Sequence, residues 1–292
     1  MTANNSPYHS LKDKWLKKHK ELQKNLWDKH EDALEEFINN SKHLAIGTLS
    51  GIMLLTSPIA GLLPTPGVHA KEAAFPIKLD KNIFLVSDLA NILPNEVRPL
   101  TNTEEATISA LLSNRFGLKV SPELDGKRLN RSYGFIGAEQ HLARFPGDNM
   151  NTHFDTDNEA LSFTSSGMAP GLGAWGYFAP SYDNLKPEDK LKEKYYIAAQ
   201  TFLAPGFNEN VRDFITFFKY RKMLIVNPSN GKAMVVVIGD AGPAEWTGKH
   251  LGGSPEVMKY LERVDGAQKG AVLYFFIDDH ENKVPLGPIE TK

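Results

Sequence analysis

The sequence predicts a mostly β protein with α additions, on three observations. After residue 194, short apolar segments follow one another, separated by turns that contain glycine or proline. Residues 233–238 are entirely apolar and rich in valine, which is typical of a strand buried on both faces. Nearer the N-terminus, leucines and other apolar residues recur at three- and four-residue steps, as on amphipathic helices. We therefore expect a β domain over residues 151–280, followed by a tail over 281–292.

Composition excludes several classes of function. The chain has 292 residues and a formal net charge of −2, so it lacks the basic excess of a dedicated nucleic-acid binder. It contains no cysteine, which removes disulfides, thiolate catalysis and zinc–thiolate sites.

Residues 1–43 are dense in charge and carry an apolar stripe that includes Leu11, Trp15 and Leu22. The stripe predicts an amphipathic helix on the cytoplasmic side. Such a helix can bind a partner or a membrane surface, or it can be a solvated helix with a modest apolar seam.

Residues 44–70 contain no Asp, Glu, Lys or Arg. The apolar stretch 45–63 would nearly cross a hydrocarbon layer of ~30 Å at ~1.5 Å per residue. Small residues precede Lys71 in the run Val68-His69-Ala70, as signal peptidase requires. We expect a transmembrane helix or a signal sequence rather than a buried core helix. The C-terminal part is then extracytoplasmic, either held at the cell membrane or secreted after cleavage behind Ala70.

Residues 71–150 resemble a small α/β unit. Residues 83–86 form a short apolar run that we expect to be a buried strand. Thr101 with Glu104 three residues later predicts a capping box that opens a helix, and Gly117 ends that helix. The pair 125–126, Asp-Gly, predicts a hairpin turn.

The segment 223–277 carries the clearest pattern of strands and turns. Strands are expected at 223–226, 233–238 and 271–277. A turn with Pro and Gly joins the first two. Ser254 and Pro255 predict the start of a helix before the last strand.

This order resembles the double-psi β-barrel of the rare lipoprotein A family, which includes septal lytic transglycosylases and is related to expansins. The resemblance spans about 110 residues and implies a six-stranded barrel. The matching segments are Asn227-Pro228-Ser229-Asn230-Gly231-Lys232, Gly239-Asp240-Ala241-Gly242-Pro243, Thr247-Gly248-Lys249, Ser254-Pro255-Glu256-Val257, the early strand Tyr195-Tyr196-Ile197-Ala198-Ala199 and the aromatic opening strand Trp175-Gly176-Tyr177.

The resemblance implies a groove with an acid at its floor, and Asp240 matches the family's aspartate. A carboxyl at the end of an apolar strand is partly desolvated, which raises its pKa and suits a general acid that protonates a glycosidic oxygen. The alternative is a turn-forming aspartate that bonds its own backbone. Two departures leave the acid without its usual neighbours: Ala241 replaces the family's arginine, and Gly252 and Gly253 stand where relatives carry a second acid.

Other candidate site residues surround this element. Glu139 and Glu245 are candidates for the acidic partner, and His250 for orienting substrate or sharing a proton. Three aromatic residues could stack on sugar rings, although core packing is the alternative for the first of them: Trp175, Tyr177 and Trp246.

We expect no metal and no cofactor. Glu139, His141, His153 and Asp155 do not follow a familiar zinc spacing. The run Gly171–Gly173 lacks the Lys-Ser/Thr of a phosphate loop, and no Gly-x-Ser-x-Gly elbow is present.

The sequence therefore predicts a membrane-anchored or exported cell-wall protein. The first hypothesis is a lytic transglycosylase that cleaves peptidoglycan or another wall glycan with Asp240 as general acid. The others are a glycan-binding module of the same fold that does not cut, and a structural envelope protein. The expected partners are wall glycan and the membrane, without nucleic acid.

Overall fold

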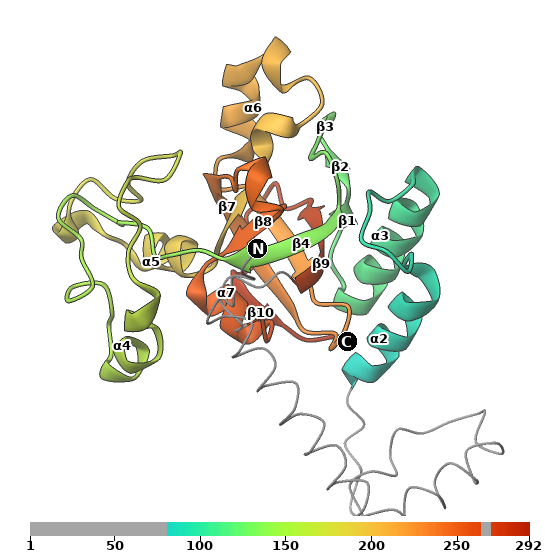
Figure 1. Ribbon diagram of the computed structural model, residues 1–292, viewed down its shortest axis with the longest axis horizontal. Helices are drawn as coiled ribbons and strands as arrows, with labels where there is room; N and C mark the ends of the chain where they lie inside the picture. Colours follow the sequence, from blue (N-terminus) through green and yellow to red (C-terminus); the bar gives the residue numbers. More distant parts are fainter. Residues whose placement is uncertain (1–80, 264–269) are drawn as a thin grey trace, which may run out of the picture. The chain divides into compact units, whose positions relative to one another are not determined.

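The computed structural model describes residues 81–263 and 270–292 (Figure 1). The predictions for 1–43 and 44–70 lie outside these residues. Within them, no helix combines the length and the apolar character that crossing a membrane requires. The helices are α2 (Lys81–Ile92), α3 (Asn102–Phe116), α4 (Asp157–Phe163), α5 (Pro187–Lys194), α6 (Val211–Phe218) and α7 (Pro255–Tyr260). The strands are β1 (Val120–Ser121), β2 (Glu123–Leu124), β3 (Lys127–Arg128), β4 (Tyr133–Ala138), β5 (Tyr196–Ala199), β6 (Lys222–Val226), β7 (Ala233–Ala241), β8 (Leu251–Gly253), β9 (Gly270–Ile277) and β10 (Gly287–Ile289).

Six strands close into a mixed β-barrel, because each of them pairs with two others of the set. The order around the barrel is β4, β9, β6, β7, β5, β8 and back to β4. The β4–β8 and β5–β7 pairs are parallel and the other four are antiparallel. This pattern is compatible with a double-psi barrel. β1 extends the sheet beyond β9, and β10 extends it beyond β7.

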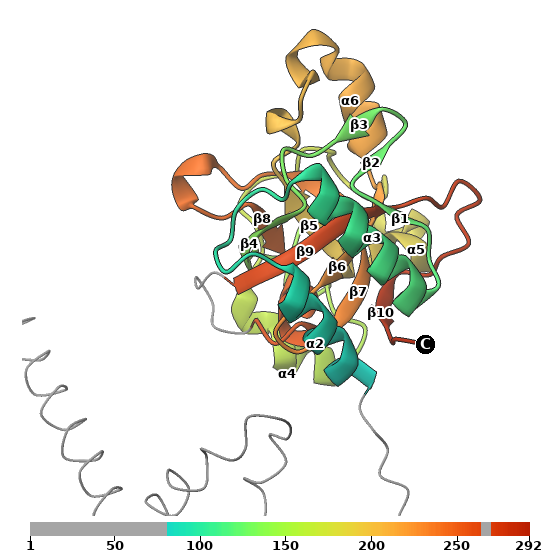
Figure 2. The same ribbon diagram turned by 90° about the vertical axis from the view of Figure 1, so that its right-hand side faces the viewer.

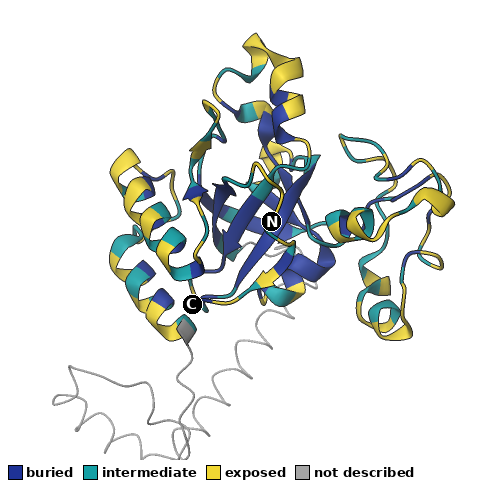
Figure 3. Ribbon diagram, turned by 180° about the vertical axis from the view of Figure 1, so that it is seen from behind, coloured by how far each residue is buried: buried dark blue, intermediate teal, exposed yellow. Residues whose placement is uncertain are grey.

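Alternating side chains of the barrel strands enter two different cores. Ile225, Val236 and Phe276 point into the barrel, where they pack with one another. Their neighbours Leu224 and Phe275 point outward into a second core. The strands are therefore apolar on both faces, as the valine-rich run 233–238 predicted, and Figure 3 shows them buried almost throughout.

Helices α2 and α3 cover the outer face formed by β6 and β9 (Figure 2). The predicted capping box at Thr101 and Glu104 begins α3, and Gly117 ends it in the left-handed conformation. Ile108 and Leu112 are fully buried against the outward side chains of the barrel. Local signals thus set the ends of α3, and its apolar face sets where it packs.

Two elements differ from the sequence predictions. The run 83–86 is a turn of α2 rather than a strand, with Leu85 buried and Phe84 exposed. The barrel opens with β4, whereas Trp175 lies in a turn over the barrel.

The domain boundaries move accordingly. Because β4 is a barrel strand, the barrel begins at residue 133 and not at 151, and the 71–150 segment is not a separate unit. The expected tail 281–292 contains β10, which pairs with β7. All the described residues, 81–263 and 270–292, belong to one compact unit.

Candidate functional site

Four carboxylates gather around Tyr196 on the outer face of β5. Burial raises the pKa of the Tyr196 hydroxyl well above its usual value, and the charges of the four carboxylates raise it further. The phenol donates a hydrogen bond to the backbone carbonyl of Gln140. The four residues come from separate elements: Glu139 follows β4, Glu193 lies in α5, Asp240 is near the end of β7 and Glu256 is in the first turn of α7.

Asp240 is half-buried and held by backbone amides. Its Oδ1 accepts hydrogen bonds from the N–H groups of Ala174, at 2.6 Å, and Ala241, at 2.7 Å. Burial raises the pKa of Asp240, while the two amides act in the opposite direction. The predicted rise in pKa is therefore present, and the carboxylate also anchors the loop around Ala174.

Glu139 fills the space that a side chain at position 252 would occupy. A Cβ placed on Gly252 would come within 2.2 Å of Glu139 Oε1. Ala198 of β5 is in register with Gly252 of β8 on one side and with Asp240 of β7 on the other. Residues in register point to the same face of a sheet, so Glu139 and Asp240 flank the outer face of β5. Glu139, which follows β4, thus places a carboxylate beside Gly252, a residue that has no side chain of its own.

Lys249 fixes the position of Glu139. Its ammonium lies 2.9 Å from Glu139 Oε1 and also donates to the carbonyl of Ala138. Lys249 precedes β8 by two residues, so this ion pair ties the end of β4 to the strand beside it.

The other predicted acid–base residues lie elsewhere. His250 Nδ1 accepts the N–H of Phe135 at 2.9 Å, and the two rings stack. Glu245 is exposed on the short helix η7 (Glu245–Thr247).

The three predicted stacking aromatics have different surroundings. Trp175 packs against the barrel core, and its indole N–H donates to the carbonyl of Ile238, so the core account of this residue is correct. Tyr177 is 38% exposed and Trp246 is 89% exposed. Only Trp246 presents most of its ring to solvent among these three.

A second group of buried side chains includes one of the four carboxylates: Glu193 forms a cluster with His141 and His153. Their nitrogen and oxygen ligand atoms all lie within 4.8 Å of one another. His153 Nε2 is 3.0 Å from Glu193 Oε2, and His141 Nδ1 is 3.4 Å from Glu193 Oε1. The sequence singled out the two histidines, but their expected companions Glu139 and Asp155 instead form ion pairs with Lys249 and Lys190.

Asp148 and Arg144 support the cluster from behind. Asp148 Oδ2 lies 3.0 Å from His153 Nδ1, and it also accepts from the guanidinium Nε of Arg144 at 2.9 Å. Burial acts to lower the pKa of His153, but its hydrogen bonds to Asp148 and Glu193 outweigh that effect and raise the pKa to about 9. Burial acts to raise the pKa of Glu193, but His141 and His153 lower it to about 2.

The side chain of His141 is fully buried, yet its Nε2 has no partner among the described residues, and its Nδ1 reaches Glu193 Oε1 only at 3.4 Å and without good hydrogen-bond geometry. Leaving a buried polar atom unsatisfied costs about 1–3 kcal/mol. An imidazole in this position therefore calls for a further partner at its nitrogens.

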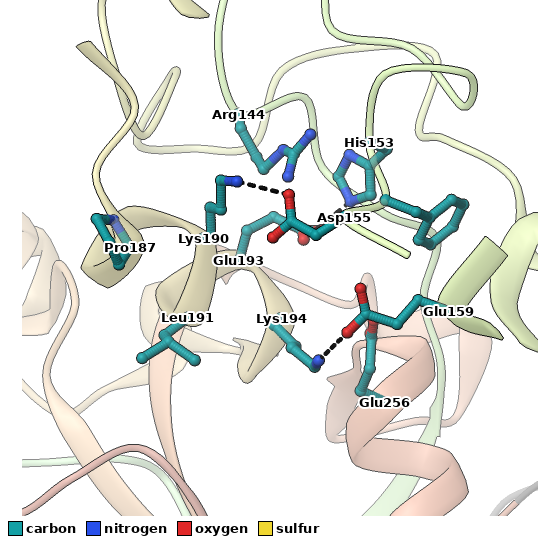
Figure 4. A pocket seen from close by; sticks show the side chains of 11 residues that line it. Arg144, His153, Asp155, Glu159, Pro187, Lys190, Leu191, Glu193, Lys194 and Glu256 are labelled. Atoms are coloured by element: carbon teal, nitrogen blue, oxygen red, sulfur yellow. Dashed lines mark hydrogen bonds and ion pairs between the residues drawn. The ribbon is translucent and has the colours of Figure 1, made fainter. Parts of the chain in front are cut away.

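A cavity of about 250 Å³ opens next to the cluster (Figure 4). His153, Glu193 and Glu256 line it, with Lys190 and Lys194 at its edge paired to Asp155 and Glu159, respectively. Glu256 is 9% exposed, and its Oε2 has no hydrogen-bond partner among the described residues. Burial raises the pKa of Glu256 to about 7.

A second cavity, of about 520 Å³, lies on the other side of α7 and is lined by Glu139, Phe163 and Arg263. Asp240 belongs to neither cavity.

Sequence reasoning missed Glu193 and the role of Glu256. Glu193 stands in a lysine- and acid-rich stretch that is typical of solvated surface, yet it is the buried residue of α5. In the sequence, Glu256 is only one residue of the segment Ser254-Pro255-Glu256-Val257 at a predicted helix start. No local pattern marks either residue, because their burial comes from segments far away in the sequence.

The chain was compared with protein-family models, curated proteins and solved structures. No protein-family model, curated protein or solved structure matches this chain.

Proposed function

We propose that this protein is an exported or membrane-anchored enzyme of the cell envelope that cleaves the glycan strands of peptidoglycan. In this proposal residues 71–292 lie outside the cytoplasm. The barrel is a member of the rare lipoprotein A-like double-psi group, and cleavage follows the lytic transglycosylase course. The closed mixed barrel and the sequence resemblance around Asp240 both support this assignment.

The observation that carries the proposal is the pair of carboxylates on the outer face of β5. Asp240 and Gly252 are both in register with Ala198, so their Cα atoms lie two strand spacings, roughly 10 Å, apart. Glu139 leans over Gly252. Enzymes that cleave glycosidic bonds place two carboxyl groups on opposite sides of the bond.

In this mechanism Asp240 is the acid. Its burial favours the protonated form, which donates a proton to the departing glycosidic oxygen as the bond from C1 breaks. The C6 hydroxyl of the same sugar then bonds to C1 to form the anhydro ring, and Asp240, now ionised, accepts the proton that this hydroxyl loses. Glu139, held by Lys249, stabilises the positive charge that develops on the sugar ring. The amide of Ala174 binds Asp240, so this mechanism requires that hydrogen bond to break when the glycan binds.

The test is product analysis with purified wall sacculi and the full-length protein in detergent. We expect the wild type to release soluble anhydro-muropeptides, detected by mass spectrometry. Asp240→Asn and Glu139→Gln should each reduce the release by roughly 100-fold or more, the usual contribution of an acid–base group. Glu123→Gln, which changes an exposed carboxylate on the β2–β3 hairpin, is the matched control and should release as much as the wild type.

A second candidate function is glycan binding without cleavage, and the exposure of Trp246 favours it. An indole that is 89% exposed offers a flat apolar surface for a sugar ring. Sedimentation with sacculi that is lost in Trp246→Ala, without any released product, would favour binding over cleavage. Absence of both binding and release would contradict both functions.

A further inference from the structure

We propose that His141, His153 and Glu193 bind a divalent transition-metal cation of the Zn²⁺ class. The three side chains reach one point from three parts of the chain: the segment after β4, the loop before α4, and α5. All three are at least 95% buried. This inference rests on other residues than the proposed glycan cleavage.

The donor set and its spacing fit such an ion. Two imidazole nitrogens and one carboxylate are a common set of protein ligands for zinc in enzymes. Ligand atoms about 2.0–2.1 Å from a tetrahedral ion lie roughly 3.3–3.4 Å from one another. The distance from His141 Nδ1 to Glu193 Oε1 is 3.4 Å, and that from His153 Nε2 to the other oxygen, Oε2, is 3.0 Å. With one ligand atom from each residue the set lies within 4.8 Å, so the side chains would draw closer together around an ion.

His141 is the independent observation that points to a ligand. The ring is fully buried, its Nε2 has no partner among the described residues, and its Nδ1 lies 3.4 Å from Glu193 Oε1 without good hydrogen-bond geometry. The rings of Phe154 and Phe163 approach it edge-on, and the charge of Glu256 also acts on it. A cation at the cluster would bind one of these nitrogens directly.

The residues behind the cluster hold its members in the orientation that a metal requires. Asp148 Oδ2 lies 3.0 Å from His153 Nδ1 and can accept its proton in a hydrogen bond, so a cation that displaces the proton on Nε2 would meet the lone pair of that nitrogen beside Glu193. A carboxylate behind a ligating histidine is the usual outer partner at zinc sites. The N–H of Leu142 donates to Glu193 Oε1 at 3.0 Å and fixes that carboxylate.

The site has room for a fourth ligand. His153 and Glu193 line the cavity of about 250 Å³, and Glu256 lines it too (Figure 4). Zinc sites with three protein ligands and an open position activate water, whereas structural sites are closed by four. Glu256 lines the same cavity, and its Oε2 has no hydrogen-bond partner among the described residues.

The alternative is a proton instead of a metal. A doubly protonated His153 could bridge Asp148 and Glu193, which accounts for the two 3.0 Å contacts. It leaves His141 Nε2 without a partner among the described residues, and it predicts no affinity for cations.

The experiment uses the full-length protein in detergent after dialysis against EDTA. Titration with Co²⁺, followed by visible absorption, reports coordination by nitrogen and oxygen without any enzyme assay. We expect one equivalent of Co²⁺ to give intense tetrahedral bands and one equivalent of Zn²⁺ to displace it. Zn²⁺ should also raise the thermal unfolding temperature.

Variants locate the site. His141→Gln and Glu193→Gln should abolish the bands, and Asp148→Asn should weaken binding by roughly 10–100-fold, as loss of an outer partner does. His280→Gln is the matched control, because its imidazole is exposed on the far loop and pairs only with Asp278 among the described charges. Circular dichroism checks the fold of each variant.

Wild-type protein that gives only the weak spectrum of hydrated Co²⁺ would overturn the proposal. So would bands that persist in both folded ligand variants, since the metal would then be bound elsewhere. If a ligand variant fails to fold, the wild-type spectrum and Asp148→Asn decide. Sacculus cleavage without metal binding would contradict the metal site alone, and binding without cleavage would contradict only the glycan function.

Discussion

Glu256 is a carboxylate in a place that water hardly reaches, and this burial makes the protein sensitive to pH. In an unfolded chain the group ionises near its ordinary pKa of 4.5, whereas in the folded protein its pKa is about 7. Between these values the folded state retains a proton that the unfolded state has released. The free energy of unfolding must therefore fall as pH rises through this window.

Glu256→Gln should remove this pH dependence. Each unit of pKa shift corresponds to 1.36 kcal/mol, so the wild type should lose up to about 3 kcal/mol relative to the variant between pH 4.5 and pH 8. Urea unfolding of both proteins at these two pH values, with EDTA present, measures the difference. The exposed Glu123→Gln serves as control. A gap that is equal at both pH values would contradict the burial of this carboxylate.

At the same scale, the sequence identified Asp240 but not its surroundings. A carboxylate after an apolar strand and before Gly-Pro is visible in the sequence, and so is the rise in its pKa that burial brings. The sequence does not predict that the Ala174 amide binds this carboxylate, because Ala174 lies in a loop 66 residues away. The hydrogen bonds from the Ala174 and Ala241 amides agree with the structural account of Asp240, and its role as an acid stays a prediction.

Elements whose ends depend on neighbouring residues were predicted well. The capping box of α3, its terminal Gly117 and the Asp125-Gly126 turn all form as expected. Both turn residues have positive φ, as the tight hairpin turn requires. These signals act over four residues or fewer, so the sequence alone contains them.

Thr101→Ala should cost about 1 kcal/mol of unfolding free energy, because the Thr101 side chain accepts from the Glu104 amide at the helix start. Thr107→Ala, on the exposed face in the middle of α3, is the control and should be neutral or slightly stabilising. Chemical denaturation of both variants makes the comparison. Equal effects would show that the cap contributes nothing.

The run 83–86 shows where a local pattern is ambiguous. Four apolar residues in a row fit a buried strand or one turn of a helix equally well. The structure makes them helical because Leu85 and Leu89, four residues apart, enter the core with α3, while Phe84 faces out. The helix is favoured because it buries Leu85 and Leu89 together against α3, a partner that the run 83–86 by itself does not reveal.

Over the whole molecule, the segment before β4 and the barrel form one body. Leu112 of α3 contributes to the same core as Leu224 and Phe275 of the barrel. Such a shared core couples the helices to strands more than 100 residues away. Residues 81–292 should therefore unfold together and not as an α/β unit followed by a barrel.

Leu112→Ala tests this coupling. We expect a loss of about 2–5 kcal/mol, as for other buried leucines, in a single transition. Hydrogen exchange should accelerate at the amides of β6 and β7 by the same free energy as at those of α3. The exposed Leu161→Ala in α4 is the control. Barrel amides that keep their protection while α3 loses it would show two separate units.

The sequence by itself determined the buried valine-rich strand, the helix caps, the turns and one acidic candidate, because each depends on residues close together in the chain. Only the tertiary structure decided that β4 belongs to the barrel and that Glu139 fills the space over Gly252. It also decided that His141, His153 and Glu193 meet. The physical reason is that barrel closure pairs strands separated by more than 100 residues, and the contacts that build the site exist only once the barrel has closed.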